Sequence, residues 1–279
     1  MGLLRCPHCR ADLELTDGTA GCANRHSFDL ARQGYLNLLP GNARPGTGDT
    51  AAMVQARAAF LGAGHYRTIL DAVAGAATTA LAERDPGTGS GCVIELGAGT
   101  AHHLAGVLDV LPNRVGLALD ISKHAARRAT HARQRIGAVV CDAWAPLPVR
   151  TAVAAVALSV FAPRNGAEIA RVLLPGGALV VVTPTAGHLA ELVPVLGLLS
   201  VDERKQERLD SQLDPFLAAE SARSVDQVLL LRPLDVEHLV AMGPSARHTD
   251  PGTMHERIAA LADPIRVTAS VTVAVYRRP

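Results

Sequence analysis

Four potential metal ligands lie within the first 26 residues of the chain. Cys6 and Cys9 form a C-x2-C pair, and after twelve intervening residues Cys22 and His26 form a C-x3-H pair. Three sulfur ligands and one nitrogen ligand at this spacing are typical of tetrahedral zinc. The turn sequence TDGT at 16–19 separates the two pairs and predicts a hairpin that brings them together.

Free cysteines or a redox pair are the alternatives to a zinc site. The N-terminus lacks the apolar segment of a signal peptide, so we expect a cytoplasmic protein, in which clustered cysteines are more often metal ligands than disulfides. His8 lies inside the first cysteine pair, an awkward position from which to replace His26. Because four protein ligands leave no coordination position for a substrate, the zinc is predicted to be structural.

A second set of residues suits a nucleoside-containing ligand. The segment ELGAGTA carries Gly97 and Gly99, which let the backbone approach a ligand closely. Asp120 ends the next apolar stretch and can accept hydrogen bonds from both hydroxyls of a ribose. Asp142 follows the third apolar stretch, where its carboxylate can meet the edge of an adenine. Dinucleotide and S-adenosylmethionine sites share this arrangement, but the third glycine of GxGxxG is absent, which favours S-adenosylmethionine. A nicotinamide oxidoreductase and a non-enzymatic binding fold are the alternatives.

Strands and helices alternate through the segment that carries these residues. Apolar strands are expected in CVIEL, VGLALD, AVVCD, AVAAVALSV and ALVVVTP, with helices after the first, second and fourth. This alternation predicts an α/β fold with a parallel, doubly wound sheet, and the PGG turn before the last strand suits a class I methyltransferase. Residues 53–85 are predicted to be helical with a break near GAGHY, between a linker at 40–50 and a loop at 85–91.

Composition describes a globular chain of 279 residues, 48% of them hydrophobic, long enough for one large domain or a main domain with a small appendage. The net charge of +1 gives no reason to infer nucleic-acid affinity, and no apolar run is long enough to span a membrane. One local basic stretch, SKHAARRATHARQR at 122–135, contains no acid and five cations: Lys123, Arg127, Arg128, Arg133 and Arg135. An ordinary solvated helix face is the alternative to an RNA contact there.

The motifs occur together in order along nearly the whole chain. The zinc-ligand spacing and the segments HSFDLARQGYLNLLP, QARAAFLGAGHY, ELGAGT, LDISKHAARRA, FAPRNGAEIARVLLPGG and TPTAGHLAEL resemble the RlmA family of 23S rRNA (guanine-N1)-methyltransferases. VAMGPSARH is similar to its Gram-positive branch, which includes the tylosin-resistance methyltransferase. The resemblance implies a class I, Rossmann-like fold with a zinc-binding RNA-recognition domain at 1–40, linker and helices at 41–85, and an S-adenosylmethionine-dependent methyltransferase domain at 86–279.

The same resemblance implies roles for individual residues. It places Tyr66, Gly99, Thr100 and His188 in contact with S-adenosylmethionine, supports the cofactor loop with Gly97 and Asp120, and assigns zinc to Cys6, Cys9, Cys22 and His26. Without it, Tyr66 would be interpreted as packing and His188 as a surface or capped side chain. Thr100 stands where relatives carry an acidic residue in some cases, which would reduce its role to a backbone contact.

The implied reaction is methylation of N1 of a guanine in a 23S rRNA hairpin loop that lines the peptide exit tunnel, with macrolide resistance as its consequence. N1 lies on the Watson–Crick edge and bears a proton, so the guanine must be unpaired and the proton removed. Phe161, in SVFAPRN, stands where several base-methylating enzymes grip the target base, and packing against the sheet is the alternative. Asp142 and His188 are candidates to accept the proton, and the base is left unassigned.

The resemblance also implies a homodimer and a 23S rRNA partner, with neither DNA nor a membrane. RNA contacts are expected from the zinc module, from Arg44 in the linker and from the basic stretch. Two rival functions are a small-molecule methyltransferase of secondary metabolism and a non-catalytic RNA-binding protein. The first predicts methyl transfer without RNA, and the second predicts no binding of S-adenosylmethionine.

Overall fold

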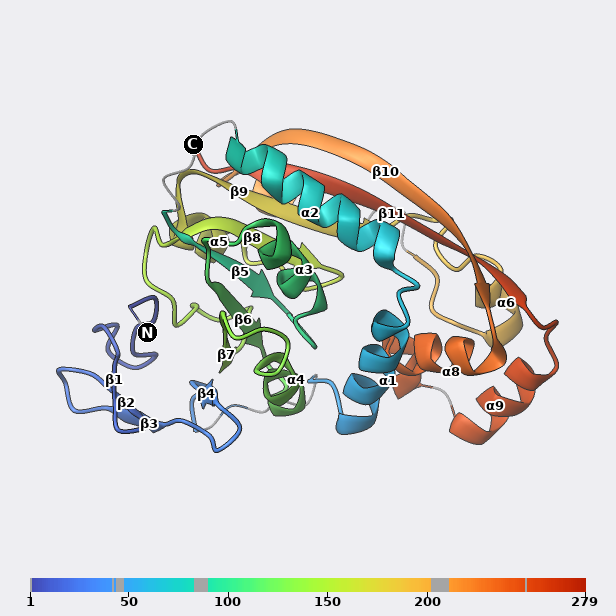
Figure 1. Ribbon diagram of the computed structural model, residues 1–279, viewed down its shortest axis with the longest axis horizontal. Coiled ribbons are helices and arrows are strands. Elements are labelled where there is room, and N and C mark those ends of the chain that lie inside the picture. The colour runs from blue at the N-terminus through green and yellow to red at the C-terminus, as the bar shows by residue number, and fades with distance from the viewer. Residues whose placement is uncertain (1, 42, 44–47, 83–89, 202–210, 249) are drawn as a thin grey trace.

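The structure is a computed structural model that describes residues 2–41, 43, 48–82, 90–201, 211–248 and 250–279 (Figure 1). The strands are β1 (Glu14–Thr16), β2 (Thr19–Gly21), β3 (Ser27–Asp29), β4 (Tyr35–Asn37), β5 (Cys92–Leu96), β6 (Gly116–Asp120), β7 (Ile136–Val140), β8 (Ala154–Val160), β9 (Leu173–Pro184), β10 (Ala218–Leu231) and β11 (Ile265–Arg277). The helices are α1 (Ala51–Gly62), α2 (Arg67–Ala82), α3 (His102–Val110), α4 (Lys123–Ala129), α5 (Gly166–Val172), α6 (Leu192–Leu196), α8 (Pro233–Ala241), α9 (Pro251–Ala259) and the short 3-10 helix η1 (Pro244–Arg247). Arg44 and most of the predicted loop at 85–91 fall outside the described residues.

One sheet of eight strands organises the chain, in the order β10-β11-β9-β8-β5-β6-β7-β4. The five strands expected from the sequence, β5 to β9, pair in parallel, which confirms the predicted α/β fold. β11, which the sequence pattern did not identify, runs antiparallel to both of its neighbours, β9 and β10, so the complete sheet is mixed. The reason is that α8 and α9 lie at one end of the sheet instead of crossing a face, and the chain turns back after them (Figure 1).

Both faces of the sheet are covered. The core on one face includes residues of α2 and α3, and the core on the other includes residues of α5 and of the N-terminal segment. Strands β5 and β8 are buried along their whole length, which explains their continuous apolar sequences CVIEL and AAVALSV. No helix in the described ranges is both long enough and apolar enough to cross a bilayer.

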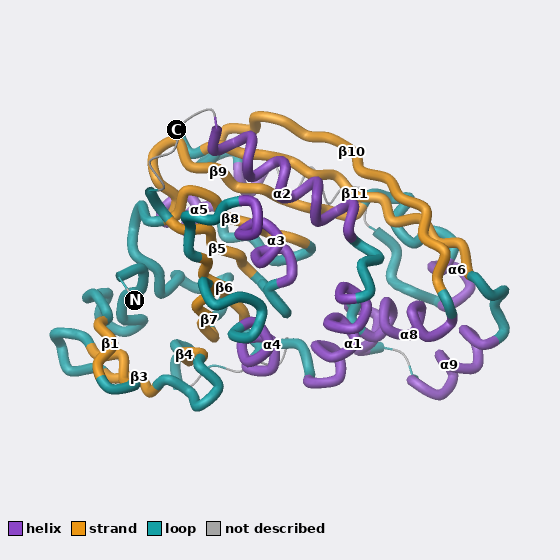
Figure 2. Tube along the Cα trace, viewed as in Figure 1, coloured by secondary structure: helices purple, strands orange, loops and turns teal. Residues whose placement is uncertain are grey.

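The N-terminal segment, mostly loop in Figure 2, forms a small sheet of its own in the order β1-β2-β3, and it reaches the large sheet through β4. Asp17 and Gly18 have φ values of 50° and 79° and close the β1–β2 hairpin, as the TDGT sequence predicts. Leu4 forms a β-bridge with Val149 and shares a core with the strands. The next strand, β4, pairs in parallel with β7 at the edge of the large sheet. The domain boundary at residue 40 stays a prediction, although β4 lies before it and belongs to the large sheet.

The helical segment before the sheet is broken where the sequence predicts. α1 begins after Thr50, whose side chain accepts the N–H of Met53, and α2 begins at Arg67. Between the two helices Gly64 has a φ of +84°, a conformation that glycine adopts freely. The break places Tyr66, at the start of α2, in the core with Phe60.

The basic stretch at 122–135 is only half helical. α4 ends at Ala129, so Arg133 and Arg135 follow the helix. Arg133 forms an ion pair with Asp109 at 2.7 Å, and Arg135 donates to backbone carbonyls, including that of Leu108 at 2.8 Å. The interpretation of the whole stretch as one basic helix face is therefore wrong, because these two arginines lie beyond α4 and are engaged by residues of α3. Lys123, Arg127 and Arg128 remain on the exposed face of α4.

Candidate cofactor site and zinc module

The N-terminal module gathers the four predicted metal ligands. Sγ of Cys6 lies 3.6 Å from Nδ1 of His26, Sγ of Cys9 lies 3.6 Å from Sγ of Cys22, and all four ligand atoms lie within 4.8 Å of one another. Tetrahedral ligation with Zn–S bonds of about 2.3 Å requires ligand atoms roughly 3.8 Å apart. The four residues therefore fit a structural zinc ion. His8 is turned onto Phe28 instead, with ring centroids 5.8 Å apart.

Each ligand pair closes a tight backbone loop. The N–H of Arg10 donates to the carbonyl of Cys6 at 3.0 Å, and the N–H of Arg25 donates to the carbonyl of Cys22 at 2.9 Å. Arg10 and Arg25 have φ values of 66° and 62°, which residues other than glycine adopt rarely. A hydrogen bond from the backbone of Ala11 lowers the pKa of the Cys9 thiol to about 6, which favours the thiolate form that binds a metal.

The loop after β5 comes close to the loop after β8. Gly97 and Gly99 have φ values of 62° and 53°, and a Cβ added to Gly97 would lie 2.7 Å from the Cβ of Ala162. Only glycine fits there without displacing the second loop. At the end of β5, Glu95 is 2% exposed, and its carboxylate accepts the N–H of Leu104 in α3 at 3.2 Å. This bond fixes the glycine loop against the helix that follows it.

Asp120 braces the glycine loop from the neighbouring strand. Its Oδ2 accepts the N–H of Gly99 at 2.8 Å, and its Oδ1 accepts the N–H of Ser122 at 2.8 Å. Burial raises the pKa of this carboxyl, and the two N–H donors act in the opposite direction. Each oxygen keeps a further lone pair, so the carboxylate can still accept a ribose hydroxyl.

Asp142 does not line the hollow beside Gly97, and neither do Asp120 and His188. Its carboxylate accepts the backbone N–H of Trp144 at 2.9 Å in the loop after β7. Trp144 is the single tryptophan of the chain and is 60% exposed, and sequence reasoning missed it. The amide of Asn165 donates to its carbonyl at 3.0 Å, which joins this loop to the one that carries Phe161. The sequence signal for Trp144 is an isolated aromatic residue two positions after an acid that follows a strand.

Three predicted site residues from distant segments meet at the other side of the glycine loop. The ring centroids of Tyr66 and Phe161 are 6.4 Å apart, those of Tyr66 and His188 are 6.1 Å apart, and those of Phe161 and His188 are 5.7 Å apart. The hydroxyl of Tyr66 lies 3.3 Å from Nε2 of His188. Tyr66 and Phe161 also line the hollow together with Gly97 and Thr100. The structure thus brings these predicted positions together.

The imidazole of His188 is neutral at neutral pH, because burial lowers its pKa to about 4. Its Nδ1 lies 3.2 Å from the backbone nitrogen of Ser270 and 3.1 Å from the carbonyl oxygen of the same residue, so either neutral tautomer finds a partner. Burial also raises the pKa of Tyr66. This pair therefore presents uncharged hydrogen-bonding groups beside the hollow.

Phe161 leaves the buried strand β8 in an unusual conformation. Its φ is 53°, and its N–H donates to the carbonyl of Val182 at 3.1 Å. A residue other than glycine in this region carries strain of about 1–2 kcal/mol, which persists only where the surroundings impose it. The ring is 38% exposed and faces Tyr66 and His188. The backbone therefore directs Phe161 out of the sheet and toward the site.

Sequence reasoning missed Arg57, which lies over the glycine loop. A Cβ added to Gly99 would be 3.1 Å from Cδ of Arg57, and the guanidinium donates to Asp49 at 2.7 Å and to the carbonyl of Met242 at 2.9 Å. Its Nε is buried without a partner among the described residues. Arg57 lies within the segment QARAAFLGAGHY, but that segment assigned it no role, and only the fold reveals that it contacts the glycine loop.

The residues around the hollow fit S-adenosylmethionine. The glycine loop and Asp120 suit its adenosine, and the unpaired Nε of Arg57 suits its carboxylate. With the side chains as they stand, the hollow measures about 30 Å³, roughly the volume of one water molecule. Binding therefore requires some of the side chains that line this hollow to move.

The chain is similar to known proteins over almost its whole length. Residues 4–45 match the family described as RlmA, N-terminal, a zinc ribbon. The chain is 48% identical to the "23S rRNA (guanine(748)-N(1))-methyltransferase" of Streptomyces fradiae, over 98% of this chain and 96% of the relative. It is 50% identical to the "Putative 23S rRNA (guanine-N(1)-)-methyltransferase" of Micromonospora griseorubida, over 98% of this chain and 97% of the relative.

Among solved structures, a chain of the complex between the Haloferax volcanii Trm112 methyltransferase activator and a methyltransferase is similar in fold. The TM-score is 0.51 at 20% identity, over 82% of this chain and 96% of the other. The four zinc ligands agree with the zinc-ribbon match.

Proposed function

The chain belongs to the family of 23S rRNA (guanine-N1)-methyltransferases, and from that premise we propose that it methylates N1 of a guanine in the 23S rRNA hairpin loop that lines the peptide exit tunnel. The observation that carries this proposal is similarity over the full length, which covers the zinc ribbon and the methyltransferase sheet together. The Streptomyces fradiae relative is named for guanine 748, so this is the first position to test. Macrolide resistance of the tylosin type is the cellular consequence we expect.

The bound cofactor supplies an activated methyl group, and the residues of the chain supply position. Asp120 holds the glycine loop through Gly99, and Arg57 offers its unpaired Nε to the cofactor carboxylate. Phe161 is exposed beside this loop, where its ring can stack on an unpaired guanine. In-line alignment of the methyl group with N1 then accounts for most of the acceleration.

The N1 proton must leave the guanine, and we infer that neither His188 nor Asp142 accepts it. His188 has a pKa lowered to about 4 by burial, so its imidazole is a weak base, and we assign it to positioning with Tyr66. The Asp142 carboxylate is engaged by the N–H of Trp144 outside the hollow, in keeping with a role at the adenine edge. The pairing of a neutral imidazole with a phenol suits orientation of the cofactor or base more than proton removal.

Primer extension tests the proposal. N1-methylguanine cannot pair, so reverse transcriptase stops one nucleotide before the modified base. Incubation of a 23S rRNA hairpin fragment with protein and S-adenosylmethionine is expected to create one such stop at a loop guanine. Absence of any stop, with intact RNA and measured cofactor binding, would show that the proposed substrate is wrong.

The same reaction separates the rival functions. Methyl transfer to a small-molecule acceptor without RNA would identify a small-molecule methyltransferase, and RNA binding without cofactor binding would identify a non-catalytic RNA-binding protein. A further part of the proposal, by family resemblance, is that the protein acts in the cytoplasm as a homodimer. Sedimentation of the purified protein tests the dimer directly.

A further inference from the structure

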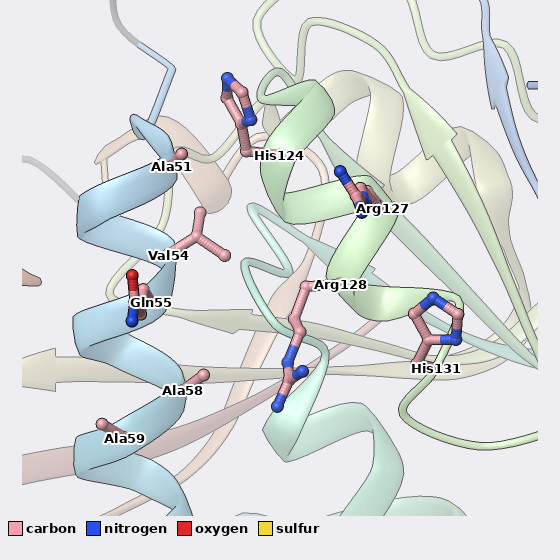
Figure 3. Close-up of a pocket in the computed structure, with 9 residues that line it drawn as sticks. All are labelled: Ala51, Val54, Gln55, Ala58, Ala59, His124, Arg127, Arg128 and His131. Carbon is pink, nitrogen blue, oxygen red and sulfur yellow. The ribbon is translucent and has the colours of Figure 1, made fainter. Parts of the chain in front are cut away.

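A groove beside the cofactor site has no role in the reaction as proposed so far. It lies between α1 and α4, has a volume of about 640 Å³ and opens to solvent (Figure 3). α1 contributes mostly short side chains, among them Ala51, Ala58 and Ala59, and α4 contributes longer ones that can be cationic, among them His124, Arg127 and Arg128. No acidic residue belongs to its lining.

The cations of this groove are not engaged elsewhere. Arg127 and Arg128 are exposed, and in the described parts of the chain no hydrogen bond or ion pair holds either side chain. Arg133, in the same stretch of sequence, is held by Asp109 through two hydrogen bonds of 2.9 and 2.7 Å. The two groove arginines therefore keep all their guanidinium donors available, a set whose fork geometry matches phosphate oxygens.

One wall of the groove, α4, contacts at its two ends the two parts of the protein that the substrate must reach. On one side, α4 lies next to the N-terminal module, where the backbone of Gly34 approaches Thr130 at the end of the helix (Figure 1). On the other side, Ser122 at the start of α4 donates to the carbonyl of Asp49, and its N–H donates to Asp120. A polymer lying in the groove would thus run from the zinc module toward the cofactor loop.

We propose that the groove between α1 and α4 binds the sugar–phosphate backbone of the RNA substrate, with Arg127 and Arg128 each contacting a phosphate. The proposal rests on the proposed function and adds the path that RNA takes across the protein. The short side chains of α1 leave room for the backbone, while the arginines of α4 supply charge. Such contacts fix the register of the RNA without reading its sequence, which leaves selection of the guanine to the site itself.

The test compares groove arginines with a matched arginine outside the groove. The double variant Arg127→Gln/Arg128→Gln and the control Arg133→Gln are titrated with a fluorescent 23S rRNA hairpin at several salt concentrations. The double variant is expected to lose affinity by on the order of tenfold, and the slope of log K against log salt should flatten by about 1.4, which is about 0.7 for each lost phosphate contact. Arg133→Gln is expected to bind RNA as the wild type does.

A variant on the α1 wall of the groove tests the proposal without changing the arginines of α4. Ala59→Glu places a negative charge on the exposed face of α1 and is expected to weaken RNA binding while S-adenosylmethionine binding, measured by calorimetry, stays unchanged. Wild-type RNA affinity and salt slope in both groove variants would overturn the proposal. So would an equal loss in Arg133→Gln. Conversion of a dimer to monomers by the groove variants would also overturn it, by showing that a second copy of the chain occupies the groove.

Failure of this proposal is distinguishable from failure of the proposed function. In one outcome, the wild-type protein binds the hairpin through the groove and yet produces no reverse-transcriptase stop. That result would support the groove proposal and contradict the proposed reaction. If the wild-type protein produces the stop and the groove variants bind RNA with wild-type affinity, the proposed reaction is supported and the groove proposal is contradicted.

Discussion

At the scale of single residues, Arg57 is the side chain whose importance only the fold reveals. Arg57→Gln is expected to weaken S-adenosylmethionine binding by about tenfold to a hundredfold, because a charge-assisted hydrogen bond is worth about 1.5–3 kcal/mol. Binding of decarboxylated S-adenosylmethionine, which lacks the group that Arg57 would contact, should change little. Calorimetry with both ligands measures the difference.

The control for Arg57 is another arginine nearby. Arg67 starts α2 and pairs with Asp71 on the exposed surface, so Arg67→Gln should bind both ligands normally. Equal losses of both ligands in Arg57→Gln would mean that the arginine only supports the loop, through Asp49 and Met242.

His188 is expected to make the free energy of unfolding depend on pH. Its pKa in the folded protein is about 4, below the usual value near 6.5, so the unfolded chain takes up a proton first as the pH falls. The stability that the neutral imidazole contributes is present above pH 6.5 and is lost between about pH 6.5 and 4. His188→Gln should therefore flatten the decline in the free energy of unfolding between pH 7 and pH 5, as measured in urea. A decline as steep as that of the wild type would contradict the assignment of a buried neutral imidazole.

At the scale of elements, local patterns predicted what local forces decide. The break between α1 and α2, the TDGT hairpin and the glycine loop follow from turn chemistry and from short apolar runs, and the structure confirms them. The four zinc ligands were equally visible, because their spacing sets their geometry.

Other elements depend on partners far away in sequence. The N-terminal strand β4 is three residues long, and nothing within it indicates that it pairs with β7, about 100 residues later. Arg133 and Arg135 contact residues of α3, which composition alone does not show. Likewise Tyr66 and His188 became site candidates through family resemblance, and only the packing of three segments brings them beside Phe161.

At the scale of the whole molecule, the zinc ion stabilises more than its own module. Cys6 and Leu13 share a hydrophobic core with strand residues such as Leu117, so loss of zinc disturbs the sheet as well. Structural zinc contributes on the order of 10 kcal/mol, comparable with the stability of a whole domain. Cys22→Ser is therefore expected to lower the melting temperature of the whole protein.

The same variant tests the division of labour between the module and the sheet. Below its melting temperature, Cys22→Ser should impair RNA methylation, followed by primer extension, more than it impairs S-adenosylmethionine binding, followed by calorimetry. The hydrogen bonds that hold the glycine loop run from Gly99 and Ser122 to Asp120 and involve no zinc ligand, which is why cofactor binding should persist. Equal loss of both activities would show that the module and the sheet do not divide the work in this way.

The edge pairing of β4 with β7 also limits how such enzymes can diversify by recombination. A target-recognition cassette joined by a passive tether can be exchanged between relatives, but here the segment that leaves the zinc ribbon is itself a strand of the catalytic sheet. Chimeras that carry a foreign ribbon and its β4 on the native sheet should lose stability, because the β4–β7 pairing and the packing of Leu4 and Cys6 against the sheet are exchanged together. New RNA targets in this lineage would then arise by substitution on a fixed scaffold rather than by shuffling of ribbons.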